Sequence, residues 1–270
     1  MSTTYNFAVI TPSTQLGLIP WRIIDIDNEK ATLWAFPIIQ APFFDLDKCK
    51  EARYIRTDYS GNNKSKGLLL KTQSDGSQIG DDSGAARRYT DIMQYGSNQW
   101  AVSTLREYLN SSFLNSMPDD FQDAVIPQKH TLLLRKVLYS GKINRTTERQ
   151  AYSDTVEVYD KFEEDGLRYT YSEVTDSVYL PSIDADPVCK RLFSIPENMV
   201  QSQHYWLMDA RIDTDGDPYM VKIVTNCKDS LGRIRASLYD GNAYQTRNIA
   251  VCPMCVIKTE YIRKQAKHLF

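Results

Sequence analysis

Two cysteines near the end of the chain have the spacing that comes closest to a chemically active motif. Cys252-Pro-Met-Cys255 is a CxxC sequence, the pattern of a redox dithiol or of half a zinc site. It lies in an apolar, strand-like stretch, and the sequence has no second CxxC and only three histidines. This setting favours two buried cysteines on a core strand at residues 250–257, and it leaves thiol or zinc chemistry as the lesser alternative.

An acidic segment near residue 215 offers the oxygen ligands that calcium prefers. Its carboxylates include Asp213, Asp215 and Asp217. Arg211 and Lys222 stand where the first and last ligands of an EF-hand loop would be, so that motif is incomplete. We expect a polar turn and no cofactor here, with a calcium site of another type as the alternative.

Residues 239–248 have the composition of adaptable binding loops, in which rigid aromatic rings stand beside amides that hydrogen-bond flexibly. The candidate binding residues are Tyr239, Asn242, Tyr244, Gln245, Arg247 and Asn248. A solvated hairpin loop with Asp240-Gly241 as its turn explains the same composition equally well. The segment is therefore a candidate for receptor or glycan contacts.

Motifs for nucleotide chemistry and hydrolysis are absent from the sequence. There is no GxGxxG, GxSxG or HExxH. The three histidines are far apart in sequence, and nothing indicates a catalytic triad. We expect a protein that is not an enzyme.

Composition and charge narrow the classes of partner. The net charge is −2 and the sequence pI is about 6.0, which argues against nucleic acid as a partner. No apolar run approaches the ~20 residues that span a bilayer, so membrane insertion is not expected. The start of the chain lacks the pattern of a secretory signal, and an odd count of five cysteines fits reduced thiols made in the cytosol.

The elements predicted from periodicity and turn residues give an α+β chain with a few helices early and a meandering antiparallel sheet later. A hairpin is expected over 21–27 and 31–36, a helix over 103–114, and a short helix over 119–125. The predicted strands are 131–139, 178–181, 219–224, 235–239 and 250–257. The acidic stretch 159–166 is expected to be a solvated turn.

The predicted domain organisation is a single domain at 18–258. An N-terminal arm at 1–17 precedes it and a C-terminal tail at 259–270 follows it. Residues at about 60–90 are rich in Gly, Ser, Asn and Asp, which predicts a polar loop insertion.

The stretch Tyr95-Gly-Ser-Asn-Gln-Trp-Ala-Val-Ser-Thr-Leu-Arg-Glu-Tyr-Leu-Asn-Ser-Ser-Phe-Leu114 resembles the segment N-x-W-x-x-S-x-L-R-x-x-L-N-x-x-F. That segment is the hallmark of a domain-of-unknown-function family of gut-type bacteria and their phages. Stretches 21–25, 176–182, 205–207 and 251–257 are similar to the family in order and spacing. The resemblance implies a C-type-lectin-like fold, distantly like formylglycine-generating enzymes and phage variable receptor-binding proteins, and a role in binding or display. Met208 and Cys252 depart from it, since both stand where the family has arginine.

Physical roles for the helical motif can be assigned from spacing. Leu105, Leu109 and Phe113 are expected to bury one face, and Trp100 to cover its start. Arg106 and Asn110 lie four residues apart on a neighbouring face, where they can hydrogen-bond to adjacent loops. Trp206, like the other tryptophans, is expected to be a core anchor.

The expected function is that of a virion protein of a bacterial virus, as capsid decoration or as a tail or host-recognition component. Its partners would be other virion proteins or a host receptor, and a homo-oligomer is compatible with this role. It would be made in the host cytoplasm and located in the virion, or otherwise stay cytoplasmic. The alternatives are a glycan-binding lectin-like protein and, less favoured, a thiol or metal enzyme that uses Cys252 and Cys255.

Overall fold

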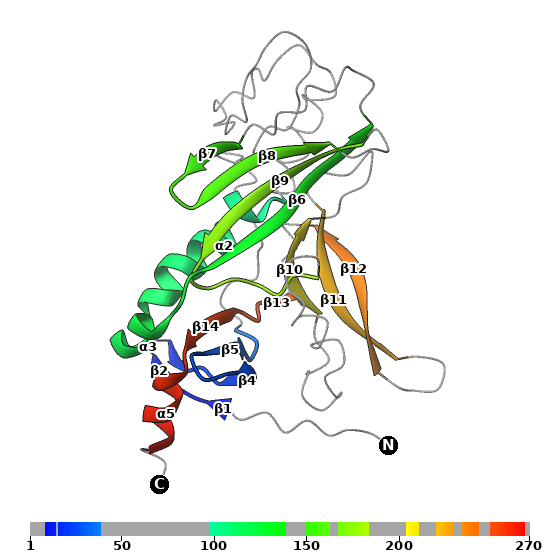
Figure 1. Cartoon of the computed structure of the whole chain (residues 1–270). Coiled ribbons are helices and arrows are strands. Elements are labelled where there is room, and N and C mark those ends of the chain that lie inside the picture. The colour runs from blue at the N-terminus through cyan, green and yellow to red at the C-terminus, as the bar shows by residue number, and fades with distance from the viewer. Residues whose placement is uncertain are drawn as a thin grey trace, which may run out of the picture.

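The computed structural model describes residues 9–14, 16–38, 98–138, 149–162, 167–183, 204–210, 220–228, 234–242 and 249–267. These residues form mostly antiparallel sheets with few helices (Figure 1), as expected for the α+β class. The expected loop insertion at 60–90 lies outside the described residues. No helix in the described part of the chain is long and apolar enough to cross a membrane.

The first four-stranded sheet joins the two ends of the chain. It has the order β1-β4-β5-β14 and consists of β1 (Val9–Ile10), β4 (Trp21–Ile26), β5 (Lys30–Ala35) and β14 (Met254–Lys258). The predicted β4–β5 hairpin is confirmed, and its turn is held by Asp27, whose Oδ1 accepts the N–H groups of Glu29 and Lys30 at 2.8 Å each. A small hairpin, β2 (Ser13–Thr14) with β3 (Gly17–Leu18), precedes it.

The predicted continuous strand over 250–257 is wrong. The chain forms β13 (Ile249–Ala250), then leaves the ladder, and only resumes strand structure at β14. Pro253 lies in the break, where its missing N–H removes a donor that a continuous ladder would need. β13 pairs in parallel with β10, whereas β14 pairs antiparallel with β5, so the break moves the chain from one sheet to another.

The second sheet has the order β6-β9-β8-β7. Its strands are β6 (Gln128–Leu138), β9 (Leu167–Asp176), β8 (Val156–Phe162) and β7 (Arg149–Ser153). The predicted strand at 131–139 is confirmed by β6. The solvated turn expected at 159–166 is wrong for residues 159–162, because they continue β8 and pair with β9; residues 163–166 are outside the described part.

The third sheet has the order β12-β11-β10-β13, with β10 (His204–Ala210), β11 (Met220–Lys228) and β12 (Ile234–Asn242). β12 runs beyond the predicted strand, so the turn expected at Asp240-Gly241 is wrong. Both residues pair with β11, opposite Lys222 and Val221. An Asp-Gly pair favours a turn only when no partner strand continues beside it, and here β11 supplies the ladder bonds.

Five helical segments complete the described fold. They are the 3-10 turn η1 (Trp100–Val102), α2 (Thr104–Tyr108), the π-helical η2 (Leu109–Phe113), α3 (Asp119–Ala124) and α5 (Thr259–Lys267). Ser103 caps α2, since its Oγ accepts the N–H of Arg106 at 3.1 Å. The segment expected as a C-terminal tail forms α5, and its Tyr261 is buried edge-on against Phe121 with 5.5 Å between ring centroids.

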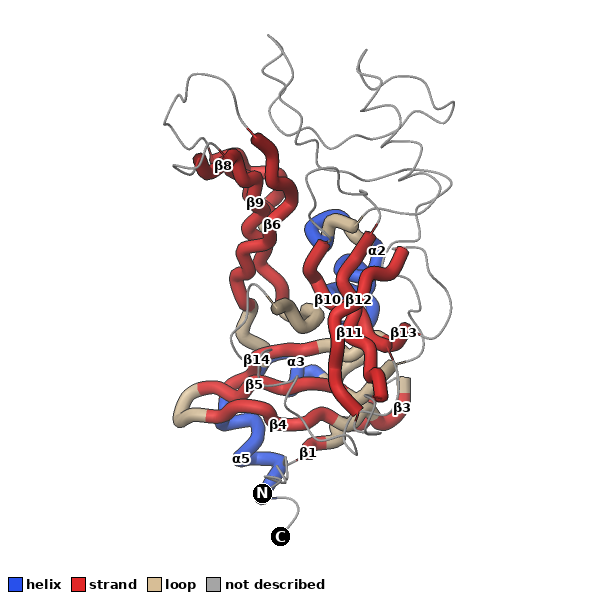
Figure 2. Tube along the Cα trace, turned by 90° about the vertical axis from the view of Figure 1, so that its right-hand side faces the viewer, coloured by secondary structure: helices blue, strands red, loops and turns tan. Residues whose placement is uncertain are grey.

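The core lies where the three sheets and the helices meet. In Figure 2 the β4–β5–β14 strands run across the view, below β6, β8 and β9, and the lower ends of β11 and β12 reach their level on the right. The four tryptophans are all buried, as expected for core anchors; they are Trp21, Trp34, Trp100 and Trp206. Leu105, Leu109 and Phe113 are at most 2% exposed, so the predicted apolar face of the helical motif is confirmed.

Candidate functional site

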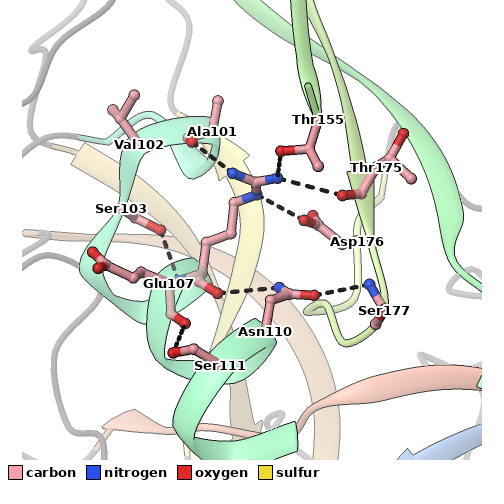
Figure 3. A pocket seen from close by; sticks show the side chains of 11 residues that line it. Ala101, Val102, Ser103, Glu107, Asn110, Ser111, Thr155, Thr175, Asp176 and Ser177 are labelled. Carbon is pink, nitrogen blue, oxygen red and sulfur yellow. Dashed lines mark hydrogen bonds and ion pairs between the residues drawn. The ribbon is translucent and has the colours of Figure 1, made fainter. Parts of the chain in front are cut away.

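A polar cleft of about 490 Å³ opens beside the helical motif (Figure 3). One wall is formed by η1, α2 and η2, and the other by the turn before β8 and the end of β9. We call it the Arg106 cleft. Its lining residues are Ala101, Val102, Ser103, Arg106, Glu107, Asn110, Ser111, Thr155, Thr175, Asp176 and Ser177.

An ion pair joins the two walls of the Arg106 cleft. Arg106 Nε lies 2.7 Å from Asp176 Oδ1, and Trp100 Nε1 donates to Asp176 Oδ2 at 2.7 Å. The Asp176 side chain is fully buried, and burial raises the pKa of its carboxyl, while the charge of Arg106 opposes this shift. Both carboxylate oxygens therefore have a charged or polar donor, as a buried charge requires.

The rest of the Arg106 guanidinium is also bonded within the protein. Nη1 donates to the carbonyl of Ala101 at 3.0 Å, and Nη2 donates to Thr155 Oγ1 at 3.0 Å and to the carbonyl of Thr175 at 3.4 Å. A guanidinium has five N–H groups. These three bonds, together with the bond from Nε to Asp176, use four of them. The expectation that Arg106 holds neighbouring loops by hydrogen bonds is confirmed.

Asn110 performs the same task one helical turn later. Its Oδ1 accepts the N–H groups of Ser177 and Val178 at 2.8 and 3.0 Å, and its Nδ2 donates to the Val178 carbonyl at 2.7 Å. Nδ2 also donates to the Arg106 carbonyl at 3.1 Å. The amide therefore substitutes for a neighbouring strand along 177–178, and this predicted role of Asn110 is confirmed.

The segment that follows β9 is held by two further elements. Tyr179 forms an isolated bridge with Met254 of β14, and the Met208 N–H donates to the Pro181 carbonyl. Asp209 of β10 accepts from Ser182 Oγ at 2.7 Å and from the Ile183 N–H at 2.8 Å. The predicted strand at 178–181 is thus reduced to a bridge, since Pro181 has no N–H with which to continue a ladder.

A row of tyrosines and an arginine lies on the outer face of the second sheet. Tyr159 and Tyr171 are directly opposite on β8 and β9, with ring centroids 5.5 Å apart and planes inclined by 25°. The ring centroids of Tyr169 and Tyr171 are 6.3 Å apart, with the ring planes inclined by 19°. The Arg149 guanidinium lies 4.7 Å from the Tyr159 ring centroid. We call these four residues the tyrosine–arginine row.

Ion pairs fix one end of the tyrosine–arginine row. Glu173 Oε2 accepts from Arg149 Nη1 at 2.7 Å and from Lys129 Nζ at 2.6 Å, and Glu157 Oε2 lies 3.4 Å from Arg149. The bonds from Lys129 and Arg149 lower the pKa of Glu173. The arginine is therefore held in place over the Tyr159 ring although its side chain is 53% exposed.

The CxxC cysteines are buried, as the sequence predicts. Cys252 and Cys255 are 3% and 0% exposed and carry free thiols. Burial raises the pKa of Cys252 to about 12 and raises the pKa of Cys255 further. Both thiols therefore stay protonated near neutral pH, which disfavours nucleophilic or metal-ligand roles, since those require the thiolate. Met208, at the other departure from the family pattern, is also buried.

The remaining predicted sites are only partly covered. Tyr239 and Asn242 belong to β12 and not to a loop, opposite Ile223 and Met220 of β11. The other candidate binding residues, at 244, 245, 247 and 248, lie outside the described residues, as do the three calcium candidates at 213, 215 and 217. Among the residues that the structure covers, no group of three His, Cys, Asp or Glu side chains could hold a metal.

The sequence prediction missed Asp176, Thr155 and the tyrosine–arginine row. The alternation of Tyr169, Tyr171 and Glu173 with smaller residues is a strand signal that would have placed all three on one face. The pairing of Arg106 with Asp176 had no local signal, because 70 residues separate them.

Comparisons with protein-family models, with curated proteins and with solved structures find no match to this chain.

Proposed function

We propose that this chain is a non-catalytic binding module with a C-type-lectin-like fold, and that it serves as a virion protein of a bacterial virus. It decorates the capsid, or belongs to the tail or host-recognition apparatus, through contacts with other virion proteins or with a host receptor. The fold family and the virion role rest on the resemblance of residues 95–114 and the four shorter stretches. The binding role rests on the chemistry of the described surface.

The tyrosine–arginine row is the observation that carries the binding role. Tyrosine and arginine are the residue types that contribute most to protein–protein interfaces, because each buries a large area and still offers a hydrogen bond. The row is already ordered by ring contacts and by the ion pairs of Glu173, so little side-chain entropy is lost on binding. A preorganised surface of this kind suits a fixed contact in an assembly.

The commitment of the helical motif to internal bonds also supports a non-catalytic role. Arg106 and Asn110 each bond to backbone groups on the opposite wall of the cleft, and Asp176 is occupied by Arg106 and Trp100. Such groups position elements and do not present a free acid, base or nucleophile. The protonated, buried thiols of the CxxC motif favour the same conclusion.

The test is co-purification of the chain with phage particles from a culture that produces both. We expect the unmodified chain to sediment with particles at a constant copy number, measured by quantitative mass spectrometry. Tyr159→Ala with Tyr171→Ala should reduce that copy number by about tenfold or more, because loss of an aromatic hot-spot side chain costs about 2 kcal/mol or more of binding free energy.

The matched control is Tyr159→Phe with Tyr171→Phe, which keeps both rings and should retain most of the binding. Circular dichroism confirms that each variant is folded. If the unmodified chain stays in the particle-free supernatant and binds neither host cells nor virion proteins, the proposed function is wrong.

A further inference from the structure

We propose that the Arg106 cleft is a binding site for a neutral saccharide unit. This rests on the proposed function, because it names a ligand class for the binding module. The described lining of the cleft does not include the residues of the tyrosine–arginine row. Its volume of about 490 Å³ lies within the usual range of small-ligand sites.

Hydroxyl groups dominate the lining of the Arg106 cleft. Five of its eleven described lining residues carry one; they are Ser103, Ser111, Thr155, Thr175 and Ser177. Ser103 and Ser111 already donate to the carbonyls of Trp100 and Glu107, and Thr155 Oγ1 accepts from Arg106. These oxygens keep acceptor lone pairs, which match a ligand whose own hydroxyl groups donate. An apolar ligand would strip water from these groups without replacing its hydrogen bonds, which is unfavourable.

The charges of the cleft select against acidic ligands. The one cation among its described lining residues, Arg106, is bonded to Asp176 at 2.7 Å and has three further acceptors within the protein. Glu107 adds a second carboxylate, so the described lining residues carry a formal charge of +1 − 2 = −1. A phosphate, sulfate or sialic acid would enter without a free cation to meet it, whereas a neutral sugar meets no such penalty.

The cleft is also preorganised. The Arg106 and Asn110 bonds fix its two walls relative to each other, and the Thr155 backbone carbonyl accepts the Thr175 N–H at 2.9 Å. In Figure 3 dashed contacts cross from the helical wall to Thr155, Thr175, Asp176 and Ser177 on the strand wall. A small, weakly bound ligand gains most from such a site, because little of its binding energy is lost to ordering the protein.

The test uses the full chain and an array of neutral hexose and N-acetylhexosamine oligosaccharides, with sialylated and sulfated oligosaccharides beside them. We expect binding to at least one neutral compound, followed by calorimetry to obtain its Kd. Ser111→Tyr, which places a ring at the cleft, should weaken that binding by about tenfold or more. Ser177→Ala should weaken it by a few-fold, about the effect of one lost hydrogen bond.

Ser112→Tyr is the matched control, because Ser112 is exposed on the same π-helical turn and does not line the cleft. It should leave the Kd within about twofold of the unmodified chain. The inference is overturned if no neutral saccharide binds, if only acidic ones bind, or if the Ser111 and Ser112 variants bind alike. A chain that sediments with particles but binds no saccharide would refute this inference alone. A chain that binds a sugar through the cleft but neither particles, virion proteins nor host cells would refute only the virion role.

Discussion

Arg106 and Asp176 form a buried ion pair that links the helical motif to the end of β9. The Asp176 side chain is fully buried and that of Arg106 is 15% exposed, so neither charge can rely on bulk water. The pair is completed by Trp100 and by three further acceptors for the guanidinium. A network bonded in this way mainly fixes one arrangement of the two cleft walls. Removing one partner of the ion pair leaves the other charge buried without a counter-charge.

Replacement of Arg106 tests how far the buried Asp176 carboxylate depends on its cation. Arg106→Met should lower the free energy of unfolding by about 3 kcal/mol, because it leaves the Asp176 carboxylate buried without its cation. Adding Asp176→Leu to that variant should recover much of the loss. Urea denaturation measures both. A double variant no more stable than Arg106→Met would show that the loss of stability does not come from an unpaired, buried Asp176 carboxylate.

His130 makes the stability of the fold depend on pH. It is 6% exposed, its ring centroid lies 4.3 Å from that of Tyr179, and its Nε2 has no hydrogen-bond partner in the described part. Burial lowers the pKa of His130 from 6.5 to about 4. Between these values the unfolded chain takes up the proton more readily than the folded one, so stability falls as pH drops through this window.

A His130→Leu variant should lack that contribution. The unmodified protein should lose about 3 kcal/mol more stability than the variant between pH 7 and pH 4, the free energy equivalent of the shift. Urea midpoints across this range measure the difference. Parallel curves for the two proteins would show that His130 does not titrate as its burial implies.

At the scale of elements, the helical motif departs from the regular helix that its spacing predicts. Residues 104–108 are α-helical, but 109–113 form a π-helix. π-helical turns are uncommon in proteins, but those that occur often lie at functional sites. Asn110 lies in this turn and reaches the backbone of residues 177–178, so the local irregularity coincides with the contact between wall and helix.

Asn110→Ala tests how much the contact between Asn110 and residues 177–178 stabilises the fold. It removes the acceptor of the Ser177 and Val178 N–H groups, which should cost about 2 kcal/mol of stability and speed hydrogen exchange at both amides. Asn110→Asp keeps the acceptor atoms and should retain slower exchange there. Unchanged protection in Asn110→Ala would mean that other bonds hold this segment.

Local patterns predicted some elements and missed others for identifiable reasons. The β4–β5 hairpin, α3 and β6 were predictable, because alternation and helix stops are read within a short window. The continued pairing of Asp240-Gly241 and of residues 159–162 was not, because the partner strand decides the outcome. For the site, Arg106 and Asn110 were identified as groups that hold loops, but their partners at 176–178 were not.

At the scale of the whole molecule, the stretches that carry the family resemblance meet in one core. Residues 176–182 contact the helical motif through Asp176, β14 through Tyr179, and β10 through Ser182. Trp34 of β5 donates to the Cys252 carbonyl at 3.2 Å, which ties the start of the chain to its end. These contacts connect the helical motif, β14, β10 and β5, so the role of these residues in the described structure is architectural.

The most direct test of the proposed function is cryo-electron microscopy of phage particles from a culture that produces this chain. We expect density for the chain at a fixed, repeated position, with the tyrosine–arginine row, centred on Tyr159 and Tyr171, against a neighbouring protein. The proposed function would be contradicted by particles that lack the chain, or by a chain attached through other surfaces with this row open to solvent.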